Sequence, residues 1–277
     1  MFRWLYNRFV RFSILVGAFF VGNNYFHKGI YQGNLKNFFY PGLNCYACPL
    51  ARFSCPMGTY QHFIADRSFP FYAVGFISII GVSLGRIICG WICPFGFFQE
   101  ILYKLKTFKF KVSSKHSYTK YIMLFVVATV IVFITGENWF CKLCPSGGVM
   151  AGIPQLSLQP ALHPLIGDLF YLKYSIVIFV ITASVFIKRP FCRFGCALGA
   201  FFGLFNKFTF FQIKVDKEKC TECYICQNVC PMDVEIFKHP DSLECIRCGR
   251  CIKACPQDAL AFYYGPIVER NYSPQRH

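Results

Sequence analysis

The sequence predicts an all-α membrane domain of four transmembrane helices, residues 1–211, followed by a small α+β domain, residues 212–277. Three observations support this fold class. The chain of 277 residues is 55% hydrophobic and 19% aromatic, more than soluble domains usually carry. Four apolar segments are separated by polar loops. The last quarter instead contains two dense runs of cysteine and a balance of charge, with nine basic and nine acidic residues over 214–277.

The apolar segments lie at about 9–22, 69–87, 120–136 and 169–187. Each is near the short end of the roughly 17–25 residues that span the hydrocarbon of a bilayer. The first segment follows several arginines, as a signal peptide does. It lacks an A-x-A-like cleavage site, so we interpret it as an uncleaved anchor.

Lysine and arginine residues predict the orientation in the membrane. With the N-terminus inside, fourteen of them lie at inner ends and loops and six in outer loops. Because basic residues favour the cytoplasmic side, we expect a multi-pass protein of the cytoplasmic (inner) membrane with both termini in the cytoplasm. The same bias explains the net charge of +16, so membrane lipid is the expected partner and nucleic acid is not.

The second and fourth apolar segments end in the same motif, which divides the membrane domain into two pseudo-repeats. Five residues recur at a single offset of 103 positions. Internal repeats of this kind commonly form a shared site at their interface. The matched positions are Arg86 and Arg189, Cys89 and Cys192, Cys93 and Cys196, Gly96 and Gly199, and Lys104 and Lys207.

The two C-terminal cysteine runs share the spacing C-x2-C-x2-C-x3-C-P. In this spacing three cysteines of one run and the fourth cysteine of the other hold a [4Fe-4S] cluster. We therefore expect two clusters, and the stretch resembles the bacterial two-cluster ferredoxins. Zinc is the alternative for C-x2-C pairs, but it seldom requires a third cysteine and a Cys-Pro twice over. The expected ligand sets are Cys220, Cys223, Cys226 and Cys255 for one cluster, and Cys245, Cys248, Cys251 and Cys230 for the other.

A third cluster is expected at the inner ends of the repeats, on Cys89, Cys93, Cys192 and Cys196. A C-x3-C spacing puts two sulfurs on one face of a helical turn, and one pair from each half completes a set of four. Arg86 and Arg189, one turn earlier, would offset the negative charge of the cluster and its thiolates. Inert buried cysteine is the alternative.

The outer loops carry five more cysteines, one more than a cubane needs. Cys55-Pro-Met-Gly matches Cys144-Pro-Ser-Gly, so we expect Cys55 to be a ligand and Cys45 to be the spare. A fourth cluster is the favoured interpretation. Disulfides or a redox-active dithiol pair stay open as alternatives, because an outer face can be oxidising. The five cysteines are Cys45, Cys48, Cys55, Cys141 and Cys144.

On the motifs Cys89–Pro94 and Cys192–Cys196 and the eight C-terminal cysteines, the chain resembles the NapH/NosR-type membrane-bound 4Fe-4S polyferredoxin family. These proteins are quinol dehydrogenase components with four spans, paired C-x3-C-P motifs and a C-terminal two-cluster ferredoxin. The resemblance covers nearly the whole chain and implies electron flow from a membrane quinol to a redox partner. One departure is Ala197, which replaces the proline of the second motif, so a different local turn is expected there.

The expected function is therefore electron transfer between the quinone/quinol pool, or an outer-face donor, and a redox protein partner such as a reductase or dehydrogenase. The chain would be the electron-transfer subunit of an oxidoreductase complex. The alternative is a membrane redox sensor or a maturation factor for a metalloenzyme. His62, with the neighbouring Gln61 and Tyr60, is a candidate for hydrogen bonding a quinone head group, although an interfacial aromatic belt is the favoured interpretation. The absence of C-x-x-C-H and of G-x-G-x-x-G after a strand argues against c-type haem and a nicotinamide or flavin fingerprint.

Overall fold

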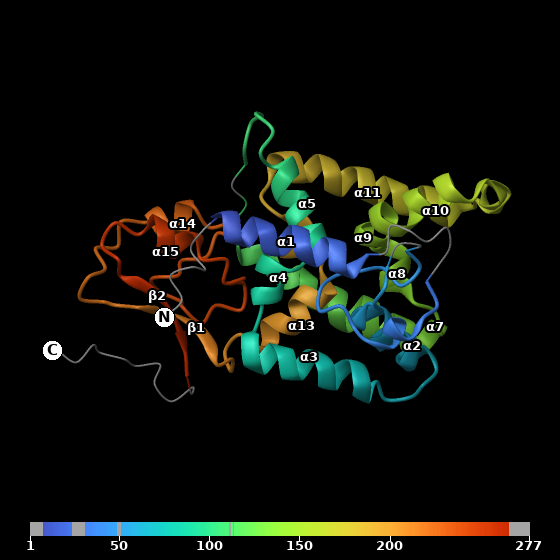
Figure 1. The fold of residues 1–277 in the computed structure, drawn as a ribbon, viewed down its shortest axis with the longest axis horizontal. Coiled ribbons are helices and arrows are strands. Elements are labelled where there is room, and N and C mark those ends of the chain that lie inside the picture. Colours follow the sequence, from blue (N-terminus) through green and yellow to red (C-terminus); the bar gives the residue numbers. More distant parts are fainter. Residues whose placement is uncertain (1–7, 24–30, 49–50, 111, 113, 266–277) are drawn as a thin grey trace.

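The computed structural model describes residues 8–23, 31–48, 51–110, 112 and 114–265. A helical part and a small part with two strands lie against each other, with α4 (Ile87–Trp91) and α13 (Ala197–Phe205) near the junction (Figure 1). Arg3, Lys28 and Lys111, which contribute to the predicted orientation, lie outside the described residues.

Each of the four predicted apolar segments forms a helix: α1 (Arg8–Gly22), α3 (Phe71–Leu84), the continuous run α6 (Thr119–Ile122), η4 (Met123–Val130) and α7 (Ile131–Thr135), and α11 (Asp168–Phe186). Two are long and apolar enough to cross a membrane, with 20 residues over His116–Thr135 and 19 over Asp168–Phe186. The apolar helices Phe9–Gly22 and Phe71–Leu84 are shorter. A helix of 14 residues rises only about 21 Å, against a hydrocarbon core of about 30 Å. The helical fold is confirmed, whereas four membrane crossings are not.

These helices expose apolar side chains instead of burying them. Phe71 and Ile79 of α3 are 77% and 71% exposed, Ile134 of α7 is 72% exposed, and Phe179 of α11 is 72% exposed. Only 22% and 17% of the two long apolar windows are buried. Core helices of soluble proteins are mostly buried, so apolar surface on this scale marks a face that contacts something apolar.

Four short helices begin directly after a cysteine: α2 (Pro56–Ala65), α5 (Pro94–Leu102), α9 (Pro145–Gly147) and α13. Proline suits the first helical position because its φ angle is preset and no backbone donor is needed there. Ala197 takes the same place, and Cys196 before it has the extended backbone (φ −81°, ψ 103°) that Cys93 has before Pro94 (φ −66°, ψ 113°). The prediction that the local turn differs at Ala197 is therefore wrong, because alanine also fits the first position of a helix.

Shorter elements connect the long helices and carry the cysteines between them. They are η2 (Asn34–Asn37), η3 (Ser114–Tyr118), α8 (Trp139–Leu143), η5 (Gly148–Gly152), α10 (Ile153–Leu158), η6 (Pro160–Leu165) and α12 (Pro190–Phe194).

The C-terminal part contains β1 (Phe211–Val215), α14 (Ile225–Asn228), α15 (Arg250–Ala254) and β2 (Leu260–Tyr264). The strands pair antiparallel, with Phe211 opposite Tyr264 and Val215 opposite Leu260. Their buried side chains form one core with Trp91 of α4. The small α+β domain thus packs directly against the helical part.

Candidate cluster sites

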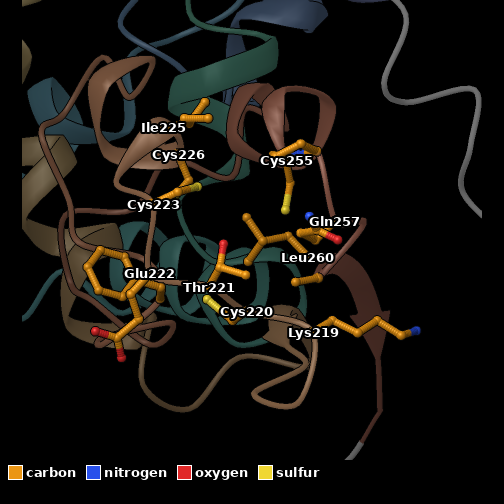
Figure 2. Close-up of a pocket in the computed structure, with 13 residues that line it drawn as sticks. Lys219, Cys220, Thr221, Glu222, Cys223, Ile225, Cys226, Cys255, Gln257 and Leu260 are labelled. Carbon is orange, nitrogen blue, oxygen red and sulfur yellow. The ribbon is translucent and has the colours of Figure 1, made fainter.

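The four cysteines that the spacing assigns to one ferredoxin cluster line a single pocket. Cys220, Cys223 and Cys226 come from the first run and Cys255 from the end of the second (Figure 2). Pro256 and Leu260 complete the wall beside Cys255. This set, the distal set, lies where the crossed spacing predicts.

The complementary set lies on the side of the domain that faces the helices. Burial and then the neighbouring thiols of Cys245, Cys248 and Cys230 raise the pKa of the Cys251 thiol well above its usual range. Burial and the thiols of Cys248 and Cys245 likewise raise the pKa of Cys230 to about 12. The structure therefore groups Cys230 with the second run, and we call these four cysteines the proximal set.

The two C-x3-C pairs of the helical part also meet. Burial and the thiols of Cys192, Cys89 and Cys93 raise the pKa of Cys196 well above its ordinary value. We call these four the inner set. The spacing predicts that both cysteines of a pair lie on one helical face. This prediction is wrong, because a helix ends between the two cysteines of each pair. Cys89 lies in α4 and Cys192 in α12, whereas Cys93 and Cys196 precede α5 and α13.

Arg86 and Arg189 are fully buried at the inner set. Arg189 donates to the Cys89 carbonyl at 2.6 Å, and Arg86 to the Cys192 carbonyl at 3.4 Å. The guanidinium of each arginine therefore contacts the cysteine pair of the other half. Each also has a buried Nε without a hydrogen-bond partner among the described residues. Both donors are consistent with a negatively charged group at this site.

A carboxylate balances each of these arginines. Glu100 lies 2.8 Å from Arg189 and also pairs with Arg11 at 3.0 Å and Arg250 at 2.6 Å. Burial alone would raise the pKa of Glu100, but the three guanidinium groups lower it to about 2. Glu100 thereby ties α1, α12 and α15 to α5.

Glu244 of the C-terminal domain has the corresponding role at the other arginine. Its carboxylate lies 3.1 Å from Arg86 and also contacts Lys120. Leu243 adds a carbonyl that accepts from Arg86 at 2.8 Å. The C-terminal domain thus supplies part of the charge balance of the inner set.

A second set of four cysteines in the helical part lies in the outer loops. Burial and the thiols of Cys55, Cys144 and Cys45 raise the pKa of Cys141, and Cys55 and Cys45 act on Cys144 in the same way. We call Cys45, Cys55, Cys141 and Cys144 the outer set. The expectation that Cys45 is the spare is wrong. Cys48 is the one set apart, since its buried thiol donates to the Met150 carbonyl at 2.7 Å.

Lysines, not arginines, accompany the outer set. Lys36 is buried, donates to the Ala51 carbonyl at 2.8 Å and is attracted by the thiols of Cys48 and Cys45. Lys173 is attracted by Cys144, and its Nζ lies 3.4 Å from where a Cβ on Gly147 would stand. The outer set therefore has its own buried positive charge.

The same local motif holds one cysteine at each of four positions in the helical part. In Cys-Pro/Ala-x-Gly the glycine amide donates back to the cysteine sulfur at the start of the helix, as Gly199 does to Cys196 at 3.2 Å. A Cβ on Gly96 would stand 3.0 Å from Arg189, and one on Gly199 would stand 3.2 Å from Arg86. Glycine thus lets the arginine of the opposite half approach. The four instances begin at Cys55, Cys93, Cys144 and Cys196.

Neighbouring sets touch through backbone. The Leu43 amide donates to Cys93 of the inner set, and the next amide, Asn44, donates to Cys55 of the outer set. On the other side, a Cβ on Gly90 would stand 2.5 Å from the Ile246 carbonyl and 3.6 Å from the Cys248 Cα. The inner set therefore lies between the outer and proximal sets.

Trp91 and Asn206 fix the junction between the helical part and the C-terminal domain by hydrogen bonds. Trp91 donates to the Arg247 carbonyl at 3.1 Å. Asn206, which is buried, donates to the Cys245 carbonyl at 2.8 Å and accepts from the Arg86 amide at 3.0 Å. These bonds hold α4 and α13 against the loop that carries the proximal cysteines.

The structure does not bring His62 to the cysteines. Its ring pairs with Asp66 at 3.6 Å on the outside of α2, with 66% of the side chain exposed. The neighbouring Gln61 is the residue of α2 that faces the outer set, where it donates to Cys141.

The donor chemistry of the four sets fits [4Fe-4S] clusters. Each set offers four cysteine sulfurs, and a [4Fe-4S] cluster is held by four cysteine thiolates whose negative charge it offsets. No disulfide joins any two cysteines in the described part of the chain. Among the described residues no three His, Cys, Asp or Glu side chains converge on a single metal ion, and the distal cysteines instead border a pocket.

Sequence reasoning missed the roles of Glu100, Glu244, Lys36, Lys173 and Gln99 at the sets, and it considered Gln61 only as a possible quinone contact. For Gln61 and Gln99 a signal was present, since each follows a Cys-Pro-x-Gly motif at the sixth position after the cysteine. Glu100 directly follows Gln99, but its partners Arg11, Arg189 and Arg250 come from three other segments. Glu244 lies 158 residues from Arg86, so no local pattern marks these ion pairs.

Comparisons with known proteins find 4Fe-4S domains in both parts of the chain. The model of a 4Fe-4S binding domain matches residues 68–113, 120–157 and 169–218, and that of a 4Fe-4S dicluster domain matches residues 207–263. An uncharacterized protein of Methanocaldococcus jannaschii is 33% identical over 198 residues, 68% of this chain and 76% of its own length. No solved structure gives a significant match.

Two relatives have names that refer to a role. The regulatory protein NosR of Stutzerimonas stutzeri is 26% identical over 162 residues, 56% of this chain but 21% of NosR. YccM of Escherichia coli (strain K12), whose name assigns it to electron transport, is 27% identical over 175 residues, 60% of this chain and 46% of YccM.

Proposed function

The chain belongs to the NapH/NosR-type 4Fe-4S polyferredoxin family, and from this premise we propose that it relays electrons between the membrane quinone pool, or an outer-face donor, and a redox protein partner. It is an iron–sulfur electron-transfer protein related to NosR and YccM. The observation that carries the finer proposal is the backbone contact from the outer to the inner set and from the inner to the proximal set, with the distal set drawn from the same two cysteine runs as the proximal set. Such an order suits a relay because electron tunnelling falls steeply with distance.

A [4Fe-4S] cluster, when bound, takes up and releases one electron at a potential that its surroundings set. The residues of this chain hold each set of thiolates and exclude water from the inner set, whose Cys93, Cys192 and Cys196 are buried. Arg86 and Arg189 offset negative charge there. We assign no catalytic residue among the residues that the structure describes.

We place the redox partner at the distal set. Cys223 is exposed, and Tyr224 and Ile225 beside it are 45% and 39% exposed. The proximal set is instead covered by α4. A soluble protein can therefore reach the distal set without moving the helical part, which supports a role for the C-terminal domain as the exit or entry point.

We further propose that all four apolar helices cross the cytoplasmic membrane, with both termini inside. Their exposed apolar faces and the distribution of lysine and arginine support this. The shorter helices would need local thinning of the bilayer. Reporter fusions after residues 112 and 277 should report a cytoplasmic position and a fusion after residue 155 an external one. An external C-terminus would overturn the orientation and the side on which the partner binds.

A regulatory role is the second candidate, because the name of the Stutzerimonas stutzeri relative calls it a regulatory protein. A redox sensor or maturation factor would use the same cysteine sets without continuous turnover. Sustained electron exchange with a quinone analogue separates the two, since a sensor changes state once and then stops.

The iron content tests the four-set assignment. Anaerobically purified protein should contain about sixteen irons per chain and little zinc, because each set holds one cubane. Cys141→Ser with Cys144→Ser should lower the count to about twelve. Cys48→Ser is the matched control and should leave it unchanged, since the Cys48 thiol packs beside Cys45 but donates to the Met150 carbonyl and is not among the thiols that act on Cys141 or Cys144. A double variant that retains all its iron would remove the outer cluster and favour the disulfide or dithiol alternative.

A further inference from the structure

Two buried glutamines have equivalent positions at the two cysteine sets of the helical part. Gln61 and Gln99 are both 0% exposed. Each lies in a helix that follows a Cys-Pro-x-Gly motif, Gln61 in α2 and Gln99 in α5. Each also reaches across to the cysteine contributed by the second half of the helical part.

The hydrogen bonds of the two side chains match atom for atom. Gln61 Nε2 donates to Cys141 Sγ at 3.2 Å, and Gln99 Nε2 donates to Cys192 Sγ at 3.2 Å. Gln61 Oε1 accepts from the Phe140 amide at 3.0 Å, and Gln99 Oε1 accepts from the Phe191 amide at 3.1 Å. In both cases Nε2 also donates to the carbonyl four residues earlier, at 3.3 Å.

This network fixes which end of each amide faces the sulfur. A backbone N–H can only be satisfied by the amide oxygen, so Oε1 must face Phe140 or Phe191 and Nε2 must face the cysteine. Turning either amide would leave a buried N–H opposite another N–H. The contact with sulfur is therefore an N–H···S hydrogen bond and not an arbitrary approach.

We propose that Gln61 and Gln99 are positioning residues that raise the reduction potentials of the outer and inner clusters, respectively, by donating to a ligating sulfur. This inference rests on the proposed cluster at each set. Reduction adds one electron, and hence one negative charge, to a cluster and its thiolates. A donor aimed at a thiolate stabilises the more negative state more strongly, so it favours reduction.

Replacement by methionine tests the proposal, because methionine has nearly the same length and cannot donate. Gln99→Met should lower the midpoint potential of the inner cluster alone, and Gln61→Met that of the outer cluster alone. The expected effect is about a tenfold change in the reduction equilibrium, which is about 59 mV for one electron. The readout is a redox titration followed by electron paramagnetic resonance. The variant lacking Cys141 and Cys144 identifies the outer signal.

Gln155→Met is the matched control, since Gln155 is a half-buried glutamine of α10, a helix that carries no cysteine. It should leave both potentials unchanged. Potentials that stay at the parent value in Gln61→Met and Gln99→Met, with iron retained, would overturn the proposal. If the parent protein itself holds no iron at these two sets, the proposed function is refuted instead. The two failures are therefore distinguishable.

A measurement on the parent protein covers the case in which a methionine variant loses its cluster. In protein labelled with 15N only at glutamine side chains, the reduced inner and outer clusters should show magnetic coupling to an amide nitrogen. The coupling reports the N–H···S contact without any substitution. Its absence at both loaded clusters would overturn the proposal.

Discussion

Replacing Cys192 with serine is expected to stop electron exchange between a quinone or quinol analogue and the two ferredoxin sets. Cys192 belongs to the inner set, which lies between the outer and proximal sets, and its sulfur accepts from Gln99. The variant should contain about four fewer irons than the parent. With that set empty, the remaining gap is too long for fast tunnelling, and the rate should fall to background.

The ferredoxin sets provide the internal control for this experiment. Their eight cysteines all lie in the C-terminal domain, so both should stay loaded and reducible by a small soluble reductant. Cys48→Ser should exchange electrons at the parent rate, because Cys48 is a buried thiol outside the sets. Parent-like exchange in Cys192→Ser would show that the inner cysteines are structural, and the regulatory alternative would then be the better one.

Replacing Glu100 with glutamine is expected to give the largest loss of stability. The carboxylate pairs with Arg11, Arg189 and Arg250, and Arg189 is fully buried. Removing one partner of a buried ion pair leaves an uncompensated charge and typically costs about 3–5 kcal/mol. For a chain of this size the melting temperature should fall by on the order of 10 °C, as measured by thermal unfolding of the purified protein in detergent.

Glu137→Gln is the matched control, since Glu137 pairs with Lys142 at 2.6 Å on the surface, with 53% of its side chain exposed. That change should cost less than about 1 kcal/mol. A melting temperature of Glu100→Gln equal to that of Glu137→Gln would contradict the assigned role of Glu100.

The pH dependence of the Glu100 effect follows from its pKa of about 2, lowered from its usual value. A carboxylate with a lowered pKa stabilises the folded state fully above its unfolded pKa of about 4.3. The stabilisation is lost as the pH falls through about 2. Between pH 6 and pH 8 the difference between parent and Glu100→Gln should therefore stay constant, and a difference that changes over this range would point to another group.

Much of the arrangement could be predicted because the cysteine spacing is local and chemically specific. The crossed ferredoxin sets and the union of the two C-x3-C pairs follow from short motifs. The four apolar helices follow from composition. Whether four helices cross the membrane is a question of length, and hydropathy alone does not settle it when a helix has 14 residues.

The choice between Cys45 and Cys48 could not be predicted, because both precede the same loop and only the folded path of residues 40–55 decides. In the structure the Asn44 amide binds Cys55, which places Cys45 beside it, whereas Cys48 turns toward Met150. Glu244 illustrates a second limit. It lies 158 residues from its partner Arg86, and its role depends on how the C-terminal domain docks.

The most direct test of the central claim is electron exchange between a quinone pool and the distal set in the intact, fully loaded protein in lipid vesicles. The account predicts that a quinol analogue reduces, or a quinone analogue oxidises, both ferredoxin clusters in the parent, and that Cys192→Ser abolishes this exchange. Clusters that a soluble reductant readily reduces, but that neither quinol nor quinone affects in the parent, would contradict the proposed relay.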